Sequence, residues 1–161
     1  MIDIDIRAAL KNEGESGTFC YEGLPDLGPD ISLKEPLVLN AQYCVTDRKV
    51  AVKGTFQTVL CTVCDRCLCD METEVSQDFD EVFWPDGTQE EEEYTYKGET
   101  VSLDKMVYDA IILGLPHQLL CREDCRGICP QCGQNLNDGE CGCKPEDADD
   151  NNPFAKLKGL F

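Results

Sequence analysis

The sequence predicts an α+β fold in which a β-rich antiparallel body carries one main helix and a cysteine-rich module. Strand-favouring residues dominate the first half of the chain, and only one stretch has a clear helical period. Six cysteines follow within residues 121–143. We therefore expect a β-rich domain over residues 1–120, the cysteine-rich module over 121–143, and an acidic linker with a short amphipathic C-terminal helix over 144–161.

Alternating and β-branched residues predict the strands of the body. Ile2, Ile4 and Ile6 recur with period two, which is typical of a half-buried strand. Residues 36–64 are dense in Val, Thr, Leu, Phe and Tyr, with turn residues at 46–48, and so predict an antiparallel pair. We expect strands at residues 2–6, 18–21, 37–45, 49–60, 71–82 and 94–97.

One helix is predicted near residues 102–114. Ser102 offers an N-cap, and Asp104 lies in the first turn, where a negative charge complements the helix dipole. The helix should end near Gly114, ahead of Pro116. Its apolar positions follow the spacing of a single face, which we expect to pack on the sheet: Leu103, Met106, Val107, Ala110 and Ile111.

Two further segments are predicted from charge and periodicity. The run Glu90–Glu93 is typical of a solvated loop. The tail 152–161 begins with an N-cap residue followed by proline, and its apolar residues form a short face. A helix this short is marginal alone. It could dock on its own domain or insert into a partner, and both interpretations remain open.

The composition bounds the partners and the location. The formal net charge is −18 and the pI about 4.2, so the field of the chain repels phosphate backbones and anionic lipid and attracts basic proteins. The start has no unbroken apolar region of the kind found in secretory signals, and the longest apolar stretch, 110–115, is too short to span a membrane. We expect a cytoplasmic protein without disulfides and without a membrane partner.

Eight of the twelve cysteines stand in four close pairs. A close pair lets one tight turn aim two sulfurs at one ion, and two such turns complete the tetrahedral shell of structural zinc. Four thiolates leave no open position for a catalytic water. We predict two structural Zn²⁺ ions, with these ligands: Cys64, Cys67, Cys121, Cys125, Cys129, Cys132, Cys141 and Cys143.

The spacing also suggests how the pairs divide. Cys129-Pro-Gln-Cys132-Gly has the form of a zinc knuckle, and Cys141-Gly-Cys143 lies nine residues downstream of Cys132, close enough to complete a local ribbon. This module is therefore predicted to be a zinc ribbon. The other two pairs would then combine, tying the hairpin to the segment after the helix. Such a site closes a long loop and gains more entropic stabilisation than the local ribbon.

Other assignments of the cysteines remain open. Cys61 and Cys64 form another two-residue-spaced pair, and Cys69 lies two positions beyond Cys67. The Cys-x-x-Cys pairs could instead be redox centres, and iron could occupy a four-thiolate site. The four cysteines outside the pairs are expected to be free, partly buried thiols: Cys20, Cys44, Cys61 and Cys69.

The sequence contains no arrangement that indicates catalysis. His117 is the only histidine, and it follows the predicted helix next to Pro116, where a surface or packing role is expected. Neither a glycine-rich phosphate loop nor a distinct acid pair is present. We expect a protein that is not an enzyme and that takes no small-molecule substrate.

Four segments together resemble the YceD family of large ribosomal RNA subunit accumulation proteins. They are Cys64-Asp-Arg-Cys67-Leu68, the helix end at 111–116, the cysteine- and asparagine-containing run 121–137, and Asn152-Pro153-Phe154-Ala155-Lys156-Leu157. The resemblance covers essentially the whole chain. It implies a non-enzymatic role in the synthesis, processing or stability of large-subunit (23S) rRNA. Variation within the family further implies that Cys64, Cys67, Cys121 and Cys125 form one site.

The leading hypothesis is therefore a ribosome biogenesis factor whose partner is a basic large-subunit ribosomal protein or a pre-ribosomal particle. In this hypothesis contact with rRNA is indirect. A second hypothesis is direct rRNA binding through Arg122 and Arg126 of the cysteine-rich module. A third is a zinc reservoir or thiol redox protein that uses Cys64 and Cys67.

Overall fold

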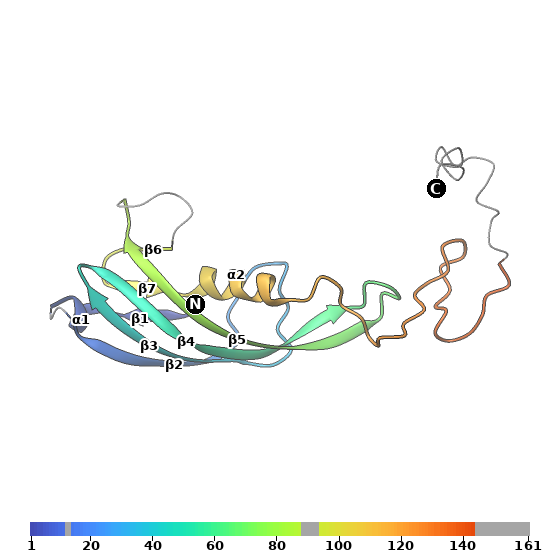
Figure 1. Cartoon of the computed structure of the whole chain (residues 1–161), viewed down its shortest axis with the longest axis horizontal. Helices are drawn as coiled ribbons and strands as arrows, with labels where there is room; N and C mark the ends of the chain where they lie inside the picture. Colours follow the sequence, from blue (N-terminus) through green and yellow to red (C-terminus); the bar gives the residue numbers. More distant parts are fainter. Residues whose placement is uncertain (12–13, 88–93, 144–161) are drawn as a thin grey trace, which may run out of the picture.

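A long, twisted sheet lies beneath a helix in the computed structural model, which describes residues 1–11, 14–87 and 94–143 (Figure 1). The sheet has the strand order β2-β3-β4-β5-β6. Neighbouring strands are antiparallel except β5 and β6, which are parallel. The strands are β2 (Ser16–Gly23), β3 (Leu37–Thr46), β4 (Lys49–Val63), β5 (Asp70–Pro85) and β6 (Thr95–Tyr96). The predicted strands are all present; β2, β4 and β5 are longer than expected, and β6 is shorter.

The β3–β4 hairpin turns on Asp47 and Arg48, within the turn predicted at residues 46–48, whereas Thr46 belongs to β3. Asp47 and Arg48 have φ of 50° and 61°, so both central residues of the turn are left-handed. Two-residue hairpins favour this type I′ geometry because its twist matches that of the strands. Thr46 pairs with Lys49, and this register places Leu39 beside Phe56 on the covered face of the sheet.

A second layer covers one face of the sheet. It contains β1 (Asp3–Asp5), α1 (Arg7–Lys11), β7 (Thr100–Ser102) and α2 (Asp104–Gly114). β1 and β7 form an antiparallel pair, and α2 lies over β5 (Figure 1). The sequence analysis missed α1 and β7, which are five and three residues long, because segments this short carry too few periods to be recognised.

The start of α2 differs from the prediction. Ser102 was expected to cap the helix, but it lies in β7 opposite Asp3, and the N-cap position is Leu103 without a side-chain cap. The backbone N–H of Leu103 donates to the carbonyl of Ile2 at 2.8 Å. The N–H of Ile2 donates to Asp104 Oδ1, also at 2.8 Å. Pairing with β1 therefore takes the place of a capping side chain, while the helix ends at Gly114 as predicted.

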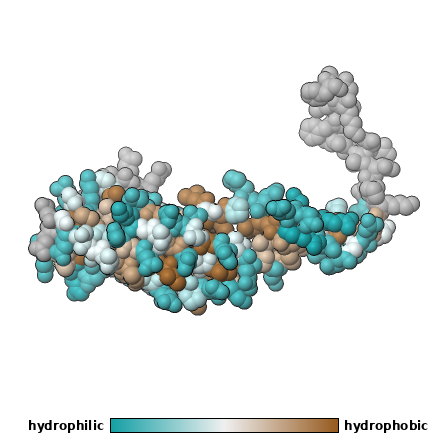
Figure 2. Space-filling model, turned by 60° about the horizontal axis from the view of Figure 1, so that its bottom comes forward, coloured by the Kyte–Doolittle hydropathy of each residue, from teal (hydrophilic) through white to brown (hydrophobic). Residues whose placement is uncertain are grey.

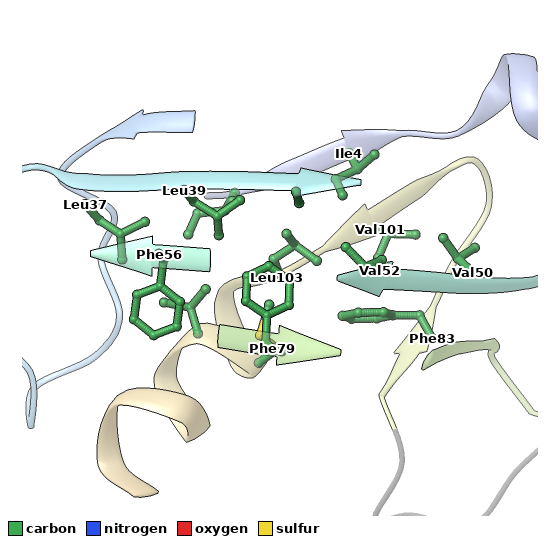
Figure 3. Close-up of a cluster of buried hydrophobic side chains, with 14 of the residues drawn as sticks. Ile4, Leu37, Leu39, Val50, Val52, Phe56, Phe79, Phe83, Val101 and Leu103 are labelled. Atoms are coloured by element: carbon green, nitrogen blue, oxygen red, sulfur yellow. The ribbon is translucent and has the colours of Figure 1, made fainter. Parts of the chain in front are cut away.

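One apolar core fills the space between the two layers (Figure 3). Phe56 and Phe83 come from the sheet, and Ile4, Val101 and Leu103 come from the covering layer; all are at most 1% exposed. The predicted apolar face of α2 contributes Met106, Val107 and Ile111. Within the described part of the chain, no helix is long and apolar enough to cross a membrane.

The other face of the sheet is exposed and, along β5, acidic. Every second residue of β5 points away from the core, and most of these residues are carboxylates. We call five of them the acidic stripe: Asp70, Glu72, Glu74, Asp78 and Asp80. Figure 2, in which the underside of Figure 1 comes forward, shows a mainly hydrophilic surface with small hydrophobic patches.

The fold class is thus an α+β protein with a β-rich, mainly antiparallel body, as predicted. The boundary between the body and the cysteine-rich module at residue 121 stays a prediction. The expected acidic loop at Glu90–Glu93 and the expected helix in the tail lie outside the described residues.

We predict that Gly54→Ala destabilises the body. Gly54 lies in β4 opposite Ala41 of β3, and an added Cβ would clash with the backbone carbonyl oxygen of Asn40. Since that neighbour is backbone, the strands must move apart, which should lower the free energy of unfolding by about 1–3 kcal/mol. Urea unfolding checks this. The control is Thr55→Ala, at an exposed neighbouring position. It should change the free energy of unfolding by less than about 0.5 kcal/mol. Equal midpoints for the two variants would contradict the close approach.

Candidate metal centres

The eight paired cysteines gather into two groups of four. Within each group, all four sulfurs lie within 4.8 Å of one another. The first group is Cys64, Cys67, Cys121 and Cys125, and the second is Cys129, Cys132, Cys141 and Cys143. The structure therefore brings together the same two sets that spacing and the family resemblance indicated. Their role as metal ligands stays a prediction.

The first group is built on the turn between β4 and β5. The backbone N–H of Cys64 donates to the carbonyl of Cys69, and that of Leu68 donates to the carbonyl of Cys64, both at 2.9 Å. These two bonds close a tight knuckle that aims Cys64 and Cys67 at the same point. The knuckle requires a left-handed residue after its second cysteine, and Leu68 supplies it with φ of 58°.

The segment after α2 delivers the other two sulfurs to this knuckle. The N–H of Asp65 donates to the carbonyl of Leu119 at 2.8 Å, and the N–H of Leu119 donates to Asp65 Oδ2 at 2.7 Å. Arg66 Nη1 donates to the carbonyl of Cys125 at 3.0 Å. These contacts join the hairpin tip to residues more than fifty positions later in the chain.

The sulfur positions of the first group suit a tetrahedral zinc ion. The distance from Cys64 Sγ to Cys125 Sγ is 3.7 Å, and from Cys67 Sγ to Cys121 Sγ it is 3.6 Å. A tetrahedron with Zn–S bonds of about 2.3 Å has S–S edges of about 3.8 Å. A disulfide would need about 2.05 Å. Two of these cysteines, Cys64 and Cys125, are 0% and 2% exposed, as befits a closed structural site.

The second group repeats the knuckle. The N–H of Cys129 donates to the carbonyl of Gln134 at 2.8 Å, and the N–H of Gly133 donates to the carbonyl of Cys129 at 2.9 Å. Gly133 has φ of 74° at the position that Leu68 holds in the first knuckle. Cys141 and Cys143 complete this group from nearby in the chain. It is the local ribbon that the spacing suggested, and Cys132 leaves it partly open to solvent.

Backbone donors favour the thiolate form in each group. The N–H of Cys121 is the main cause that lowers the pKa of Cys64 to about 6. In the second group, the N–H of Cys132 is the main cause that lowers the pKa of Cys129 to about 6. Although Cys121 is exposed, desolvation of its sulfur, followed by its contact with Cys67, raises the pKa of Cys121. Since thiolates this close repel one another, a divalent cation is needed to keep all four sulfurs deprotonated. Both groups therefore fit a bound metal ion, and zinc suits their sulfur ligands.

Asn137 links the two groups and was not identified from the sequence as a site residue. Its Nδ2 donates to Cys125 Sγ at 3.4 Å and to Asn135 Oδ1 at 2.8 Å, and its Oδ1 accepts from the N–H of Arg126 at 2.8 Å. The donation to sulfur is the main cause that lowers the pKa of Cys125. Asn137 thus orients a ligand of the first group from within the ribbon of the second. Asn137 lies in the segment 121–137 that resembles the family, which could have marked it as a site residue. No rule of cysteine spacing, however, predicts its contact with Cys125.

The four remaining cysteines lie outside both groups. Cys69 lies beside the first, with its Sγ 3.3 Å from Cys67 Sγ, and is partly buried, as is Cys44. The prediction of partial burial was wrong for Cys20 and Cys61, which are exposed. Both stand at outward-facing positions of β2 and β4, so the alternation of those strands places them on the open face.

The fold and these groups define a class of protein: a strand-rich body with a cysteine-rich segment and two four-sulfur groups that could hold metal ions, the first joining the segment to the body and the second lying within the segment. A family model described as large ribosomal RNA subunit accumulation protein YceD matches residues 52–161, and the chain belongs to this family. The match includes both cysteine groups. Membership supports a role in the accumulation of large-subunit rRNA.

Several relatives share this region. An uncharacterised protein of Mycobacterium tuberculosis is 38% identical over 93 residues, which cover 54% of this chain and 45% of the relative. One of Mycobacterium leprae is 29% identical over 107 residues, covering 63% and 49%. A maize protein named large ribosomal RNA subunit accumulation protein YCED homolog 1, chloroplastic, is 36% identical over 62 residues, covering 38% and 20%. The matches thus span half or less of each relative's length. No solved structure matches the chain.

We predict that the purified chain binds two zinc ions. Cys64→Ser and Cys129→Ser should each lower the zinc content by one ion, because a three-sulfur set lacks the closed shell. Elemental analysis with protein quantification measures this. Cys61→Ser, an exposed cysteine outside both groups, should retain both ions. If Cys64→Ser and Cys129→Ser removed the same ion, the division into two groups would be wrong.

A second prediction concerns Asn137. Asn137→Ala removes the donor to Cys125 Sγ and should weaken zinc binding at the first group by about 10–100-fold, the range seen when a partner of a metal ligand is lost. Competition with a chromogenic chelator gives the affinity. Gln134→Ala serves as the matched control, because Gln134 contacts Cys129 only through its backbone. Zinc affinity that is equal in both variants would show that the contact does not support the ligand.

Proposed function

We propose that this protein is a non-enzymatic ribosome biogenesis factor that supports large-subunit (23S) rRNA accumulation by binding a basic large-subunit ribosomal protein or an assembly intermediate that contains one. The observation that carries the proposal is the acidic stripe on the open face of the sheet. Five carboxylates along one strand form a surface that attracts cationic proteins and repels RNA. Family membership supplies the biological process.

Few cations in the described residues offset the stripe. Lys34 Nζ lies 3.3 Å from a carboxylate oxygen of Glu72, and Lys53 stands opposite Asp80 in the β4–β5 register. Exposed pairs of this kind contribute little to stability. The stripe therefore keeps a negative potential, consistent with the net charge of −18. Such a field accelerates the encounter with a basic partner in a salt-dependent way.

The metal ions have a structural role in this proposal. With four sulfurs in each group, a bound zinc ion has no position left for substrate or activated water. Its contribution is to fold a segment that is poor in apolar residues and to hold it against the hairpin tip. The residues around the first group position surfaces and take no part in a reaction.

Direct rRNA binding is the second candidate function, and the arginines of the cysteine-rich segment favour it. The side chains of Arg122 and Arg126 are 48% and 54% exposed. Each, however, lies near an acidic neighbour: Arg122 Nε is 3.5 Å from Asp124, and Arg126 Nη2 is 3.7 Å from Glu140. This local compensation weakens the attraction to phosphate, so we favour the protein partner.

Affinity purification of the tagged full-length chain at low salt tests the proposal. We expect large-subunit proteins to be retained after ribonuclease treatment and to be released by increasing salt. Replacing both Arg122 and Arg126 with Glu should leave this retention intact. Direct RNA binding would give a different result. The chain would then recover rRNA, the double arginine variant would not, and no ribosomal protein would stay bound after ribonuclease treatment.

A cellular readout accompanies the binding assay. In a strain that lacks the protein, the ratio of large- to small-subunit rRNA should fall and be restored by the wild-type chain. A catalytic function would predict a different result. Replacing one residue would then abolish the recovery of the rRNA ratio, although the fold, the metal content and partner binding stay intact. His117→Ala, at an exposed position after α2, is the first variant to examine, and it should rescue fully.

A further inference from the structure

A groove of about 680 Å³ lies where the acidic stripe meets the first cysteine group. Three parts of the chain form it: the segment 30–34, the paired ends of β4 and β5, and the segment that follows α2. Its volume is within the range of about 300–1,000 Å³ that ligand sites occupy. The first cysteine group does not line it, so the groove is a feature separate from the candidate metal centres.

The walls of the groove are largely apolar. Apolar residues come from all three parts. The hairpin contributes Leu60 and Met71, the segment after α2 contributes Leu115 and Leu119, and the segment 30–34 contributes Ile31. Val63 also lines the groove and is 49% exposed, which is high for an apolar side chain. Apolar area of this kind is what a partner's aliphatic or aromatic side chain would cover.

Carboxylates surround this apolar surface. Asp30, Asp65, Asp70 and Glu72 all line the groove, against the single cation Lys34. Some of these carboxylates have partners within the chain. Tyr108 Oη donates to Asp30 at 3.3 Å, the N–H of Leu119 donates to Asp65, and Lys34 pairs with Glu72. None of these contacts involves Asp70, which is exposed at the edge of the groove.

The groove continues into the acidic stripe. Asp70 and Glu72 belong to both, and Glu74, Asp78 and Asp80 extend the same row along β5. An extended chain has side chains on one face at about 6.5–7 Å intervals, which is also the spacing of the stripe. A bound segment could therefore place one apolar side chain in the groove and successive basic side chains over the carboxylates.

We propose that this groove and the adjoining stripe bind a basic segment of a ribosomal protein, with an apolar side chain in the groove and flanking Lys or Arg residues on Asp70 and the stripe. The inference rests on the proposed function and names the surface that carries it. Charge complementarity selects a basic protein over RNA, because the same carboxylates repel phosphate.

The first cysteine group lies next to one wall of the groove in the chain. Asp65 lies within the knuckle, and Leu119 precedes Cys121 by two residues; their two mutual hydrogen bonds hold one wall in place. A metal ion held by this group would fix Cys121, and with it the nearby Leu119, against the knuckle, and its removal would then release that wall. Binding of the basic segment should therefore require a metal-loaded first group but not the second.

The experiment uses the full-length, zinc-loaded chain and two probes: large-subunit ribosomal proteins freed of rRNA, and the rRNA of the same subunits. Proteins retained on the immobilised chain are identified, and the affinity of the tightest is measured in solution. Asp70→Lys should weaken that affinity about tenfold or more, and Val63→Ser about fivefold. Asp3→Lys is the matched control, since it makes the same charge reversal at an exposed position of β1, outside the groove, and should leave the affinity within about twofold.

The outcomes separate this inference from the proposed function. Suppose that a ribosomal protein binds with an affinity that Asp70→Lys and Val63→Ser lower no more than Asp3→Lys does. In that case the proposed function stands, and the groove is not the binding surface. If only rRNA binds, both are wrong. Zinc content and melting temperature, measured for each variant, identify any loss caused by misfolding. A complex with a second copy of the chain, detected by sedimentation and sensitive to Asp70→Lys, would also overturn the inference.

Discussion

The attachment of the β4–β5 hairpin tip to the segment after α2 is the constraint on which the rest of the molecule depends. One end of this hairpin lies over the apolar core, where Phe56 and Phe83 are buried. The other end extends beyond this core, and the buried residues there are cysteines of the first group. There, four sulfurs and the hydrogen bonds of Asp65 and Arg66 replace apolar burial. Zinc coordination would couple the folding of this end to that of the body, because one ion would join residues from both.

The two knuckles show the same backbone solution with different side chains. Both require a left-handed residue after the second cysteine, and the second knuckle uses Gly133, which adopts that conformation without strain. The first uses Leu68, for which it costs about 1 kcal/mol or more. The side chain of Leu68 is also 62% exposed, so core packing does not repay this cost. A leucine kept in a strained, exposed position at the hairpin tip is consistent with a surface that contacts another molecule.

Much of this architecture was predictable from the sequence, because its signals were local. The β3–β4 hairpin followed from the turn at Asp47 and Arg48, and the end of α2 from Gly114. The start of α2 was not predictable, since Ser102 is a good capping residue that pairs with the remote Asp3 instead. The division of the cysteines followed from spacing and family resemblance. The contact of Asn137 with Cys125 depends on how the ribbon folds back, and no pattern in the sequence encodes that.

The position of β5 in the sheet gives the acidic stripe a further consequence. Between residues 70 and 83, β5 pairs with β4 on one side, and within the described residues no strand adjoins its other side. An unpaired strand edge is a template for polymerisation, and proteins commonly protect such edges with charge. Two molecules that approached edge to edge here would bring two rows of like charges together. The acidic stripe therefore also disfavours edge-to-edge pairing of this strand with a second copy.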